Sequence, residues 1–329
     1  MSTSKMNSLQ AVNKALHTAM AQDDKVIVFG EDIADAEGGG VTGTCKGLTD
    51  AYGTDRVRTT PISEQAIIGA AIGAALGGYK PVPEIMLMNF TTVAMDMIHN
   101  HAAKLRFMSG GQTSVPLTIR TLTGAGWQTA GQHADHLEGW FAHSAGIKVV
   151  CPSSPADYAG LLLSCIQDPD PCIFVESAGS LFIPGEVPDE LTPIPLGKAN
   201  VLTEGTDITI LSWSAQTVRN QMALEGLVEA GISAELIDLR TINPWDKETV
   251  FASVEKTGRL LVTHEANKNF GPGAEIAATV SEELFGKLKA PVKRLGGPEC
   301  AVPFAKVLED AFLVQPADVV AAAKELTGK

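Results

Sequence analysis

The segment Thr60–Gly78 limits what this chain can fold into more than any other part of the sequence. Pro61 disfavours helix at the residue before it, and Glu64 is the only charged residue between Pro61 and Lys80. We therefore predict a helix that is apolar on all sides. Ser63 is expected to cap its first amides, and Glu64 falls in its first turn, where a negative charge suits the helix dipole.

Three glycines, Gly69, Gly73 and Gly77, recur along one side of this helix. They let a second backbone approach closely, despite a helix cost of about 1 kcal/mol each. We expect a tight helix-to-helix seam there, either within the chain or across a subunit boundary. Glu64, at the edge of such a seam, would be poorly hydrated and able to share a proton with a ligand nitrogen. The alternative is that Glu64 only occupies a helix start, where acids are common.

Length and charge narrow the class of protein. A chain of 329 residues with 45% hydrophobic residues is long enough for two domains, each with its own core. Lys and Arg total 25 against 38 Asp and Glu, for a net charge of -13. This balance argues against nucleic acid or an anionic membrane as the main partner. No apolar run reaches the ~20 residues that a membrane span requires.

The cysteine pattern indicates a reducing compartment. The five cysteines are odd in number and form no CxxC pair, which disfavours a disulfide framework and a zinc ribbon. The amino terminus shows neither a signal-peptide nor a transit-peptide pattern. We therefore expect a cytoplasmic protein. The cysteines are Cys45, Cys151, Cys165, Cys172 and Cys300.

Apolar runs and helical periods alternate along the first half of the chain. This alternation is typical of a parallel α/β sheet, and we expect one such domain over residues 1–185. Helical patterns besides the central one fall at 9–16, 46–53, 91–107 and 155–167. Short apolar runs predict buried strands at 25–32, 56–60, 81–90, 115–120, 147–152 and 171–176.

A second parallel-sheet α/β domain is predicted after a linker. Four prolines and no long apolar period mark residues 177–200 as irregular, and we place the linker at 186–204 and the second domain at 205–329. Strands are expected at 207–213, 233–239, 259–264 and 291–295, with helices at 215–230, 247–256, 273–288 and 317–326.

Two places carry the other candidates for chemistry. Phe90 ends a predicted strand, and open α/β sheets bind ligands at the carboxyl ends of their strands. The Gly-rich loop 123–136 carries His133 and His136, spaced i, i+3 around Asp135. A metal site, a proton-transfer role for His133 and a structural role all stay open. No GxSxG, Walker A, HExxH or convincing GxGxxG motif occurs, which counts against several common enzyme classes.

Several motifs, in order along nearly the whole chain, resemble one family. The family is that of the beta subunits of the thiamine-diphosphate-dependent decarboxylating component of 2-oxo acid dehydrogenase complexes, of the pyruvate, branched-chain 2-oxo acid or acetoin type. The motifs that carry the resemblance are Thr60–Gln65, Asn89–Phe90, Ala103–Gln112, Gly131–His133, Gly146–Ser154, Ile237–Asp246, Glu255–Leu260 and Gly273–Ala277.

The resemblance implies a transketolase-like pyrimidine-binding domain followed by a transketolase-type carboxyl-terminal domain. It implies an α2β2 assembly with a separate alpha subunit, which shares thiamine diphosphate and decarboxylates a small 2-oxo acid, or cleaves acetoin. The acyl group would then pass to a lipoylated acyltransferase core. By the matching motifs, Glu64 is expected to bond the ring nitrogen of the aminopyrimidine, Phe90 to pack on that ring, and His133 to face the thiazolium and the substrate.

The resemblance also implies where the metal ions are held. Family members bind the diphosphate through Mg²⁺ and a GDG motif, and this sequence has no GDG triplet. The Mg²⁺ ligands are therefore expected in the alpha subunit. Family members also often hold K⁺ with backbone carbonyls, and the matching positions are Leu117, Cys165, Ile166, Asp168 and Asp170.

One motif departs from the family pattern, and it leaves the substrate open. Where many relatives have Gln-His-Ser-Gln, this chain continues from His133 to Ala134, Asp135 and His136. The roles of Asp135 and His136 are open, so pyruvate is not assumed. Two other functions also remain: a carboligase or transketolase-type half-subunit that forms acyloins, and a noncatalytic assembly subunit on the same fold.

Overall fold

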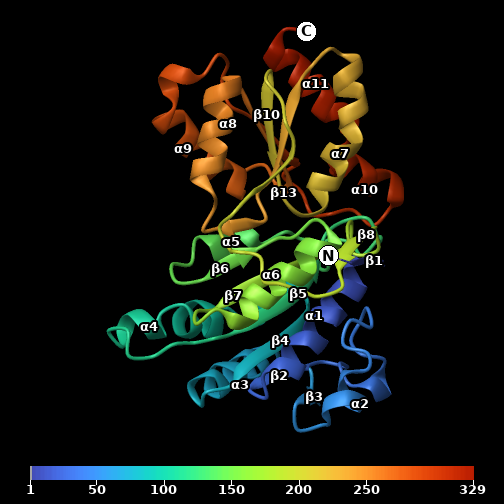
Figure 1. The fold of residues 1–329 in the computed structure, drawn as a ribbon, viewed down its shortest axis with the longest axis vertical. Coiled ribbons are helices and arrows are strands. Elements are labelled where there is room, and N and C mark those ends of the chain that lie inside the picture. Colours follow the sequence, from blue (N-terminus) through green and yellow to red (C-terminus); the bar gives the residue numbers. More distant parts are fainter. Residues whose placement is uncertain (1) are drawn as a thin grey trace. The chain divides into compact units, whose positions relative to one another are not determined.

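The fold is known from a computed structural model that describes residues 2–329. The chain divides into two compact units, each coloured along the sequence in Figure 1. The first unit runs up to Thr123 and resumes with Trp140–Leu196. The second unit combines Gly197–Lys329 with the segment Gly124–Gly139, which we call the His133 loop. The His133 loop therefore packs with the second unit, although it lies within the first half of the sequence.

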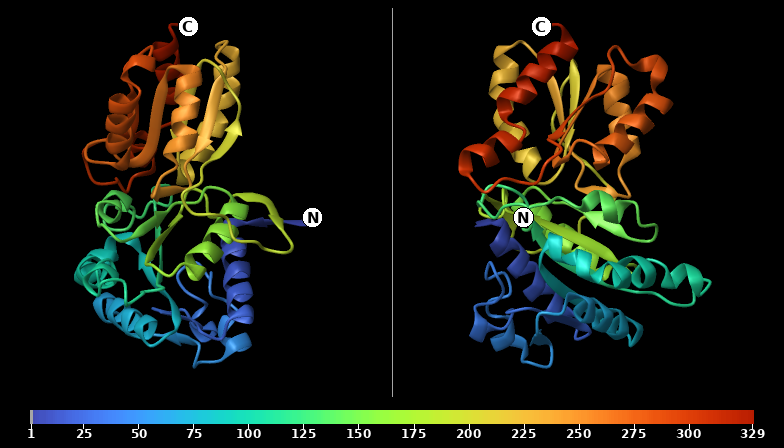
Figure 2. Two further views of the ribbon diagram at one scale, coloured as in Figure 1. Left: turned by 60° about the vertical axis from the view of Figure 1, so that its left-hand side comes forward. Right: turned by 180° about the vertical axis from the view of Figure 1, so that it is seen from behind.

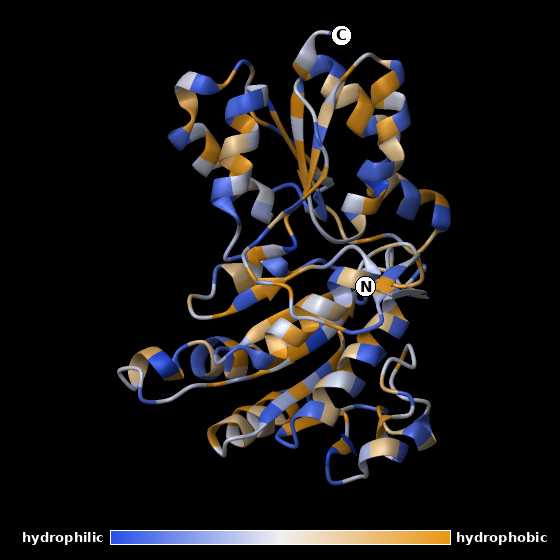
Figure 3. Ribbon diagram, viewed as in Figure 1, coloured by the Kyte–Doolittle hydropathy of each residue, from blue (hydrophilic) through white to orange (hydrophobic). Residues whose placement is uncertain are grey.

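The first unit contains the predicted parallel sheet. Its strands lie in the order β6-β7-β5-β4-β2-β3, and every neighbouring pair among them is parallel. Figure 3 shows its central strands largely in the hydrophobic colour, as expected for strands buried on both faces. The strands are β2 (Val26–Gly30), β3 (Val57–Thr59), β4 (Lys80–Leu87), β5 (Thr118–Thr123), β6 (Lys148–Val150) and β7 (Cys172–Ser177).

Local signals explain the two long helices that pack on each other in this unit, α1 and α6. The Asn7 side chain accepts from the Gln10 amide at 2.9 Å, and the Gln10 side chain accepts from the Asn7 amide at 2.9 Å. The two hydrogen bonds form a capping box at the start of α1. Ser154 caps α6, which begins with Pro155. The helices are α1 (Ser8–Gln22), α2 (Leu48–Tyr52), α3 (Glu64–Leu76), α4 (Leu105–Met108), α5 (Glu138–Ala142) and α6 (Pro155–Gln167), with the short η1 (Asp35–Glu37).

The single helix expected at 91–107 is wrong in detail. The structure has a 3₁₀ helix η2 (Met88–Ala94), a π-helix η3 (Asp96–Ala102) and then α4. The hydroxyl groups of Thr91 and Thr92 donate to the carbonyls three residues earlier, at 2.5 and 2.7 Å. Such local bonds compete with regular α-helical pairing and favour the tighter 3₁₀ winding.

A small sheet that the sequence did not predict lies at the ends of the first unit. Strand β1 (Thr3–Asn7) pairs antiparallel with β8 (Pro184–Pro188). The Thr3 hydroxyl donates to Glu186 at 2.7 Å, and the Ser4 hydroxyl donates to Asp189 at 2.6 Å. Neither strand alternates polar and apolar residues. They are strands only because they pair with each other, although they lie far apart in the sequence.

The second unit is an α/β sandwich around a five-stranded sheet of order β14-β13-β10-β11-β9. Helices α8 and α9 cover one face and α7 and α11 the other, as Figure 1 and the right-hand view of Figure 2 show. The pairs β10–β11, β10–β13 and β13–β14 are parallel, as expected, and the edge strand β9, which the sequence did not predict, is antiparallel to β11. An antiparallel edge strand needs no crossover connection, and such strands are common in doubly wound sheets.

These are the elements of the second unit. The strands are β9 (Asn200–Thr203), β10 (Ile208–Ser212), β11 (Ala234–Asp238), β12 (Thr241–Asn243), β13 (Leu260–Asn267) and β14 (Lys293–Gly297). The helices are α7 (Ser214–Glu229), α8 (Lys247–Thr257), α9 (Pro272–Glu283), η4 (Phe285–Lys287), α10 (Lys306–Phe312) and α11 (Pro316–Thr327). Among residues 2–329, no helix has the length and apolar character needed to cross a membrane.

Candidate active site

The parallel sheet of the first unit reverses its winding between β2 and β4. From β2 the chain continues to β3 on one side, and it then crosses back through α3 to β4 on the other side. Such a switch point leaves a crevice at the carboxyl ends of the two strands, where open α/β sheets bind ligands. Glu31 follows β2 directly, and Phe90 lies just beyond β4.

Helix α3 brings Glu64 to the same edge. The helix begins at Glu64 after the carboxyl end of β3, and the Glu64 side chain belongs to the first turn, as predicted. Only 9% of Glu64 is exposed. The predicted cap is wrong, because the Ser63 side chain makes no capping bond; ψ at Ser63 is 71°, against 172° and 154° at the working caps Asn7 and Ser154.

Glu31 is a second acid at this edge of the sheet, and the sequence analysis did not single it out. Its side chain is 7% exposed. Burial, and then the charges of Glu64 and Asp32, raise the pKa of Glu31. Glu31 and Glu64 therefore lie within electrostatic reach of each other. The signal that could have identified Glu31 is its place at the end of a buried strand beside the strand that leads to Phe90.

The elements that carry Phe90 and Glu64 pack on each other. Phe90 is half-buried on η2, and α3 packs directly against η2. An acid that is shielded from water, with an aromatic ring on a contacting element, suits a flat heteroaromatic ring that carries a basic nitrogen. That Glu64 and Phe90 bind such a ring stays a prediction.

His133 belongs to the second unit. It is half-buried, and its amide donates to the carbonyl of Ala130 at 3.2 Å. Ala130 and Gln128 both have positive φ, at 64° and 55°, which is uncommon for residues other than glycine. Strained backbone of this kind is found where the surrounding contacts determine a loop closely. That His133 faces the same cofactor as Glu64 stays a prediction.

His136 lies between two carboxylates of the second unit. Its two ring nitrogens lie 3.4 Å from Glu138 and 3.5 Å from Glu265, and the side chain is 3% exposed. Residues 2–329 contain no group of three or more His, Cys, Asp or Glu that could hold a metal ion. The geometry therefore favours a structural role for His136, as the partner of two carboxylates, over the metal-ligand role that the sequence left open.

The positions expected to bind K⁺ lie together in the first unit. The carbonyl of Leu117 accepts from the Cys172 amide at 2.8 Å, and that of Cys165 accepts from the Asp168 amide at 3.2 Å. The Lys148 ammonium lies 2.8 Å from an Asp168 oxygen and 3.5 Å from an Asp170 oxygen. A cationic side chain thus already approaches the two acids that follow α6.

Two family models match the chain and together cover most of its length. "Transketolase, pyrimidine binding domain" matches residues 4–182, and "Transketolase, C-terminal domain" matches residues 197–319. The chain is 43% identical to the beta subunit of acetoin:2,6-dichlorophenolindophenol oxidoreductase of Cupriavidus necator, covering 98% of this chain and 97% of that protein. The chain belongs to this family of transketolase-like dehydrogenase beta subunits.

Other members and one solved structure agree with this membership. The beta subunit of the pyruvate dehydrogenase E1 component of Bacillus subtilis is 42% identical over 98% of both chains. A solved structure described as a split-gene transketolase, an inactive beta4 tetramer, superposes with a TM-score of 0.81 over 98% of both chains at 20% identity. That structure shows the fold alone. The two expected transketolase-like α/β domains are confirmed.

Proposed function

We propose that this chain is the beta subunit of a thiamine-diphosphate-dependent 2-oxo acid or acetoin dehydrogenase, which passes an acyl group to a lipoylated acyltransferase. One observation carries the proposal: a buried carboxylate, Glu64, starts an apolar helix at the switch point of a parallel sheet. It does so in a chain that matches dehydrogenase beta subunits from end to end.

The residues of the first unit fit the pyrimidine half of the cofactor. When bound, thiamine diphosphate supplies an acidic thiazolium carbon that attacks the substrate carbonyl. Glu64 would hold a proton at the pyrimidine ring nitrogen, a task that suits a carboxylate shielded from water. Glu31 supplies a second acid near Glu64, and burial, followed by the charge of Glu64, raises the pKa of Glu31. Phe90 would pack on the ring face and exclude water.

A partner chain is indicated by the outer side of α3. Close packing was expected on the glycine side of α3. Within the chain it is found at Gly69, where a Cβ would lie 3.5 Å from the Met97 sulfur. Ala66, Ala70 and Gly73 are exposed, and a Cβ at Gly73 would meet nothing within 4 Å among the described residues. A smooth apolar face of small residues suits close packing with another helix. We propose that an alpha subunit and a second copy of this chain complete an α2β2 assembly.

We propose that the two subunits bind different parts of the cofactor, and that the alpha subunit binds Mg²⁺ and the diphosphate. The grounds are the missing GDG triplet and the fit of this chain to the pyrimidine half alone. The substrate is proposed as a small 2-oxo acid or acetoin, and the compartment as the cytoplasm. Acyloin formation and a noncatalytic role remain the competing functions.

The test of the function is reconstitution. This chain would be co-expressed with its alpha subunit and supplied with thiamine diphosphate, Mg²⁺, free lipoamide and a panel of 2-oxo acids and acetoin. Acyl lipoamide as the product supports the proposal. An acyloin without acyl transfer would support the carboligase function instead, and no turnover on any substrate would favour the noncatalytic role.

Replacing His133 with alanine is expected to lower kcat/KM for the substrate about ten- to a hundredfold. The reason is the loss of one hydrogen bond to a charged group, worth roughly 1.5–3 kcal/mol. Affinity for thiamine diphosphate should not change, since Glu64 and Phe90 remain. Steady-state kinetics with 2-oxo acid and lipoamide varied in turn would measure this. Unchanged kinetics with both substrates would remove His133 from the site.

Potassium is expected to stabilise the first unit if the carbonyls of Leu117, Cys165 and Ile166 and the acids Asp168 and Asp170 form the proposed site. Occupation by an ion worth about 1 kcal/mol should raise the melting temperature by about 2–4 °C in potassium chloride over sodium chloride at equal ionic strength. Differential scanning fluorimetry of the assembled protein measures this. Equal melting temperatures would show that Lys148 is the only cation there.

A further inference from the structure

The His133 loop is held by buried carboxylates of the second unit. Glu265 on β13 accepts from the Ala125 amide at 2.6 Å. Glu309 on α10 accepts from the amides of Gly126 and Gln128 at 2.7 and 3.0 Å. Both acids are almost completely buried, at 5% and 0% exposure. The start of the loop thus depends on negative charge that water does not solvate.

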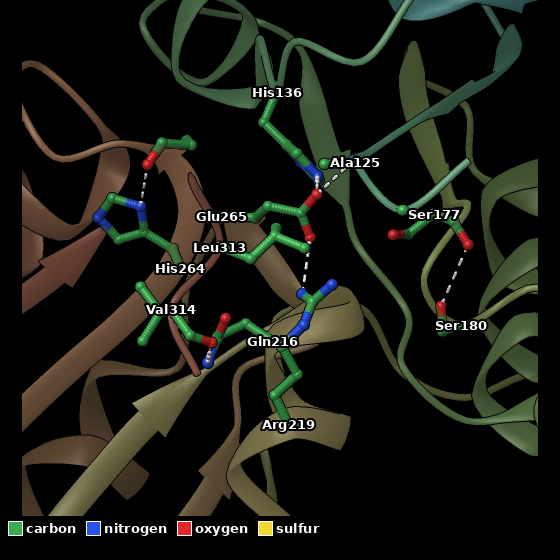
Figure 4. Close-up of polar contacts among 12 residues, drawn as sticks. Ala125, His136, Ser177, Ser180, Gln216, Arg219, His264, Glu265, Leu313 and Val314 are labelled. Atoms are coloured by element: carbon green, nitrogen blue, oxygen red, sulfur yellow. Dashed lines mark hydrogen bonds and ion pairs between the residues drawn. The ribbon is translucent and has the colours of Figure 1, made fainter. Parts of the chain in front are cut away.

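The imidazole of His136 connects the other end of the same loop to the same strand. Its Nδ1 lies 3.4 Å from Glu138, and its Nε2 lies 3.5 Å from the Glu265 oxygen that accepts from Ala125. Figure 4 shows His136, Ala125 and Arg219 converging on Glu265. Arg219 on α7 approaches the other Glu265 oxygen at 3.0 Å. One carboxylate therefore joins both ends of the loop to β13.

The carboxylates on both sides of His136 favour its protonated form. Burial alone disfavours the imidazolium, but the charges of Glu138 and Glu265 outweigh it and raise the pKa of His136 to about 10. Burial opposes ionisation of Glu265 as well, yet His136, and then Arg219, lower its pKa to about 2. The two acids are thus matched by two cations, His136 and Arg219. Without the imidazolium, Glu138 would have no cation beside it among the groups described here.

The other groups around His136 do not replace this charge. Trp213 donates from its indole nitrogen to Glu138 at 3.1 Å, but it is neutral. His264 stacks on Trp213 with ring centroids 5.2 Å apart. Burial lowers the pKa of His264 to about 4, so this ring is uncharged at neutral pH. Of the two rings His136 and His264, His136 is therefore the one that carries charge.

We propose that His136 is a positioning residue: its charged ring bridges Glu138 and Glu265 and fixes the His133 loop to β13. His133 lies three residues before it on the loop. The consequence for catalysis rests on the proposed function of His133, whereas the fixing of the loop does not. Under this proposal His136 balances the charge of Glu138 on the loop and of Glu265 on β13, and it does not contact the substrate.

The test compares His136→Gln with His136→Lys in the assembled complex, and uses His143→Gln as the control. His143 is an exposed histidine a short distance along the chain. Hydrogen–deuterium exchange by mass spectrometry reads the amides of Ala125, Gly126 and Gln128 directly. Losing a buried ion pair should speed their exchange about tenfold or more in His136→Gln. His136→Lys keeps the positive charge and should recover most of the protection, and His143→Gln should match the wild type.

Activity provides a second readout that separates the two proposals. His136→Gln should lower kcat/KM for the substrate, and His136→Lys should restore a large part of it. If His133→Ala is fully active, the role of His133 fails, while the exchange data still decide the fixing of the loop. Wild-type exchange in His136→Gln would overturn the proposal. If that variant does not fold, His136→Lys decides: a folded, protected loop supports the bridge, and a loop that exchanges as fast as unfolded peptide overturns it.

Discussion

Replacing Glu64 with glutamine is expected to lower kcat of the assembled enzyme by about a thousandfold or more, while leaving the protein folded. Glutamine keeps the size and one hydrogen bond of the side chain but has no carboxylate to stabilise a proton on the ring nitrogen. Positioned proton transfer contributes about 10²–10⁴-fold in enzymes, and here every turnover would depend on it. The loss corresponds to roughly 4 kcal/mol or more of transition-state stabilisation.

The decisive measurement is exchange of the thiazolium C2 proton of the bound cofactor, followed by NMR after acid quench. This step precedes the substrate, so it separates a defect in activation from a defect in substrate binding. Gln65→Ala is the matched control, because Gln65 is the next residue of α3 and is exposed. Glu64→Gln should abolish rapid exchange and Gln65→Ala should not. An active Glu64→Gln complex would leave only the noncatalytic assembly role for this chain.

The parts of the fold that could be predicted from sequence are those with local causes. The Pro61 turn and the apolar run after Glu64 define α3 without any help from distant residues, and the apolar runs define the central strands. Edge features could not be predicted in this way. Strands β1 and β8 form only because each pairs with a segment far along the chain. Strand β9 forms by antiparallel pairing with β11 at the edge of the sheet.

The residues of the candidate site differ in the same way: some have local sequence signals, and others depend on distant parts of the chain. Glu64 and Phe90 could be found because a helix start and a strand end are local signals. Glu31 was missed because its importance comes from the order of strands, which places β2 beside β4. The association of the His133 loop with the second unit depends on Glu265 and Glu309, which lie far along the chain. Only folding reveals that those carboxylates meet the loop amides.

Replacing Arg120 with methionine is expected to lower the free energy of unfolding by about 3–5 kcal/mol, the largest stability effect that the first unit offers. Arg120 lies on β5 and is 1% exposed. Its guanidinium reaches Glu84 on β4 at 2.9 Å and Glu176 on β7 at 2.6 Å. The arginine therefore joins three neighbouring strands through buried charge. Methionine fills much of the volume but leaves two carboxylates without a cation.

The pH dependence of the variant identifies the cause. Burial raises the pKa of Glu176 even with Arg120 beside it, and without the arginine that pKa should rise further. A carboxyl whose pKa is raised on folding binds a proton in the folded chain before it does so in the unfolded chain. Lowering the pH from neutrality towards the unfolded value of about 4.3 should therefore restore stability to Arg120→Met, by up to about 1.4 kcal/mol per pH unit for each proton.

A matched substitution excludes a general effect of removing an arginine. Arg58 on β3 is exposed, and its nearest acid, Asp55, is 3.9 Å away at the surface. Arg58→Met should change the unfolding free energy by no more than about 0.5 kcal/mol. Urea denaturation of both variants across pH measures the difference. A loss in Arg120→Met that is the same at every pH would show that packing, and not uncompensated charge, is responsible.

Arg120 should also affect the cofactor site without contacting it. Glu84 lies on the strand that leads to Phe90, and its carboxylate lies against the loop after β2: the Cys45 thiol donates to it at 3.6 Å, and a Cβ at Gly40 would lie 2.9 Å from a Glu84 oxygen. Releasing Glu84 from Arg120 removes the contact that holds this carboxylate against the loop. Affinity for thiamine diphosphate should then fall in Arg120→Met even under conditions where the variant is fully folded. Unaltered cofactor affinity would mean that the ion cluster stabilises the sheet and leaves the site independent of it.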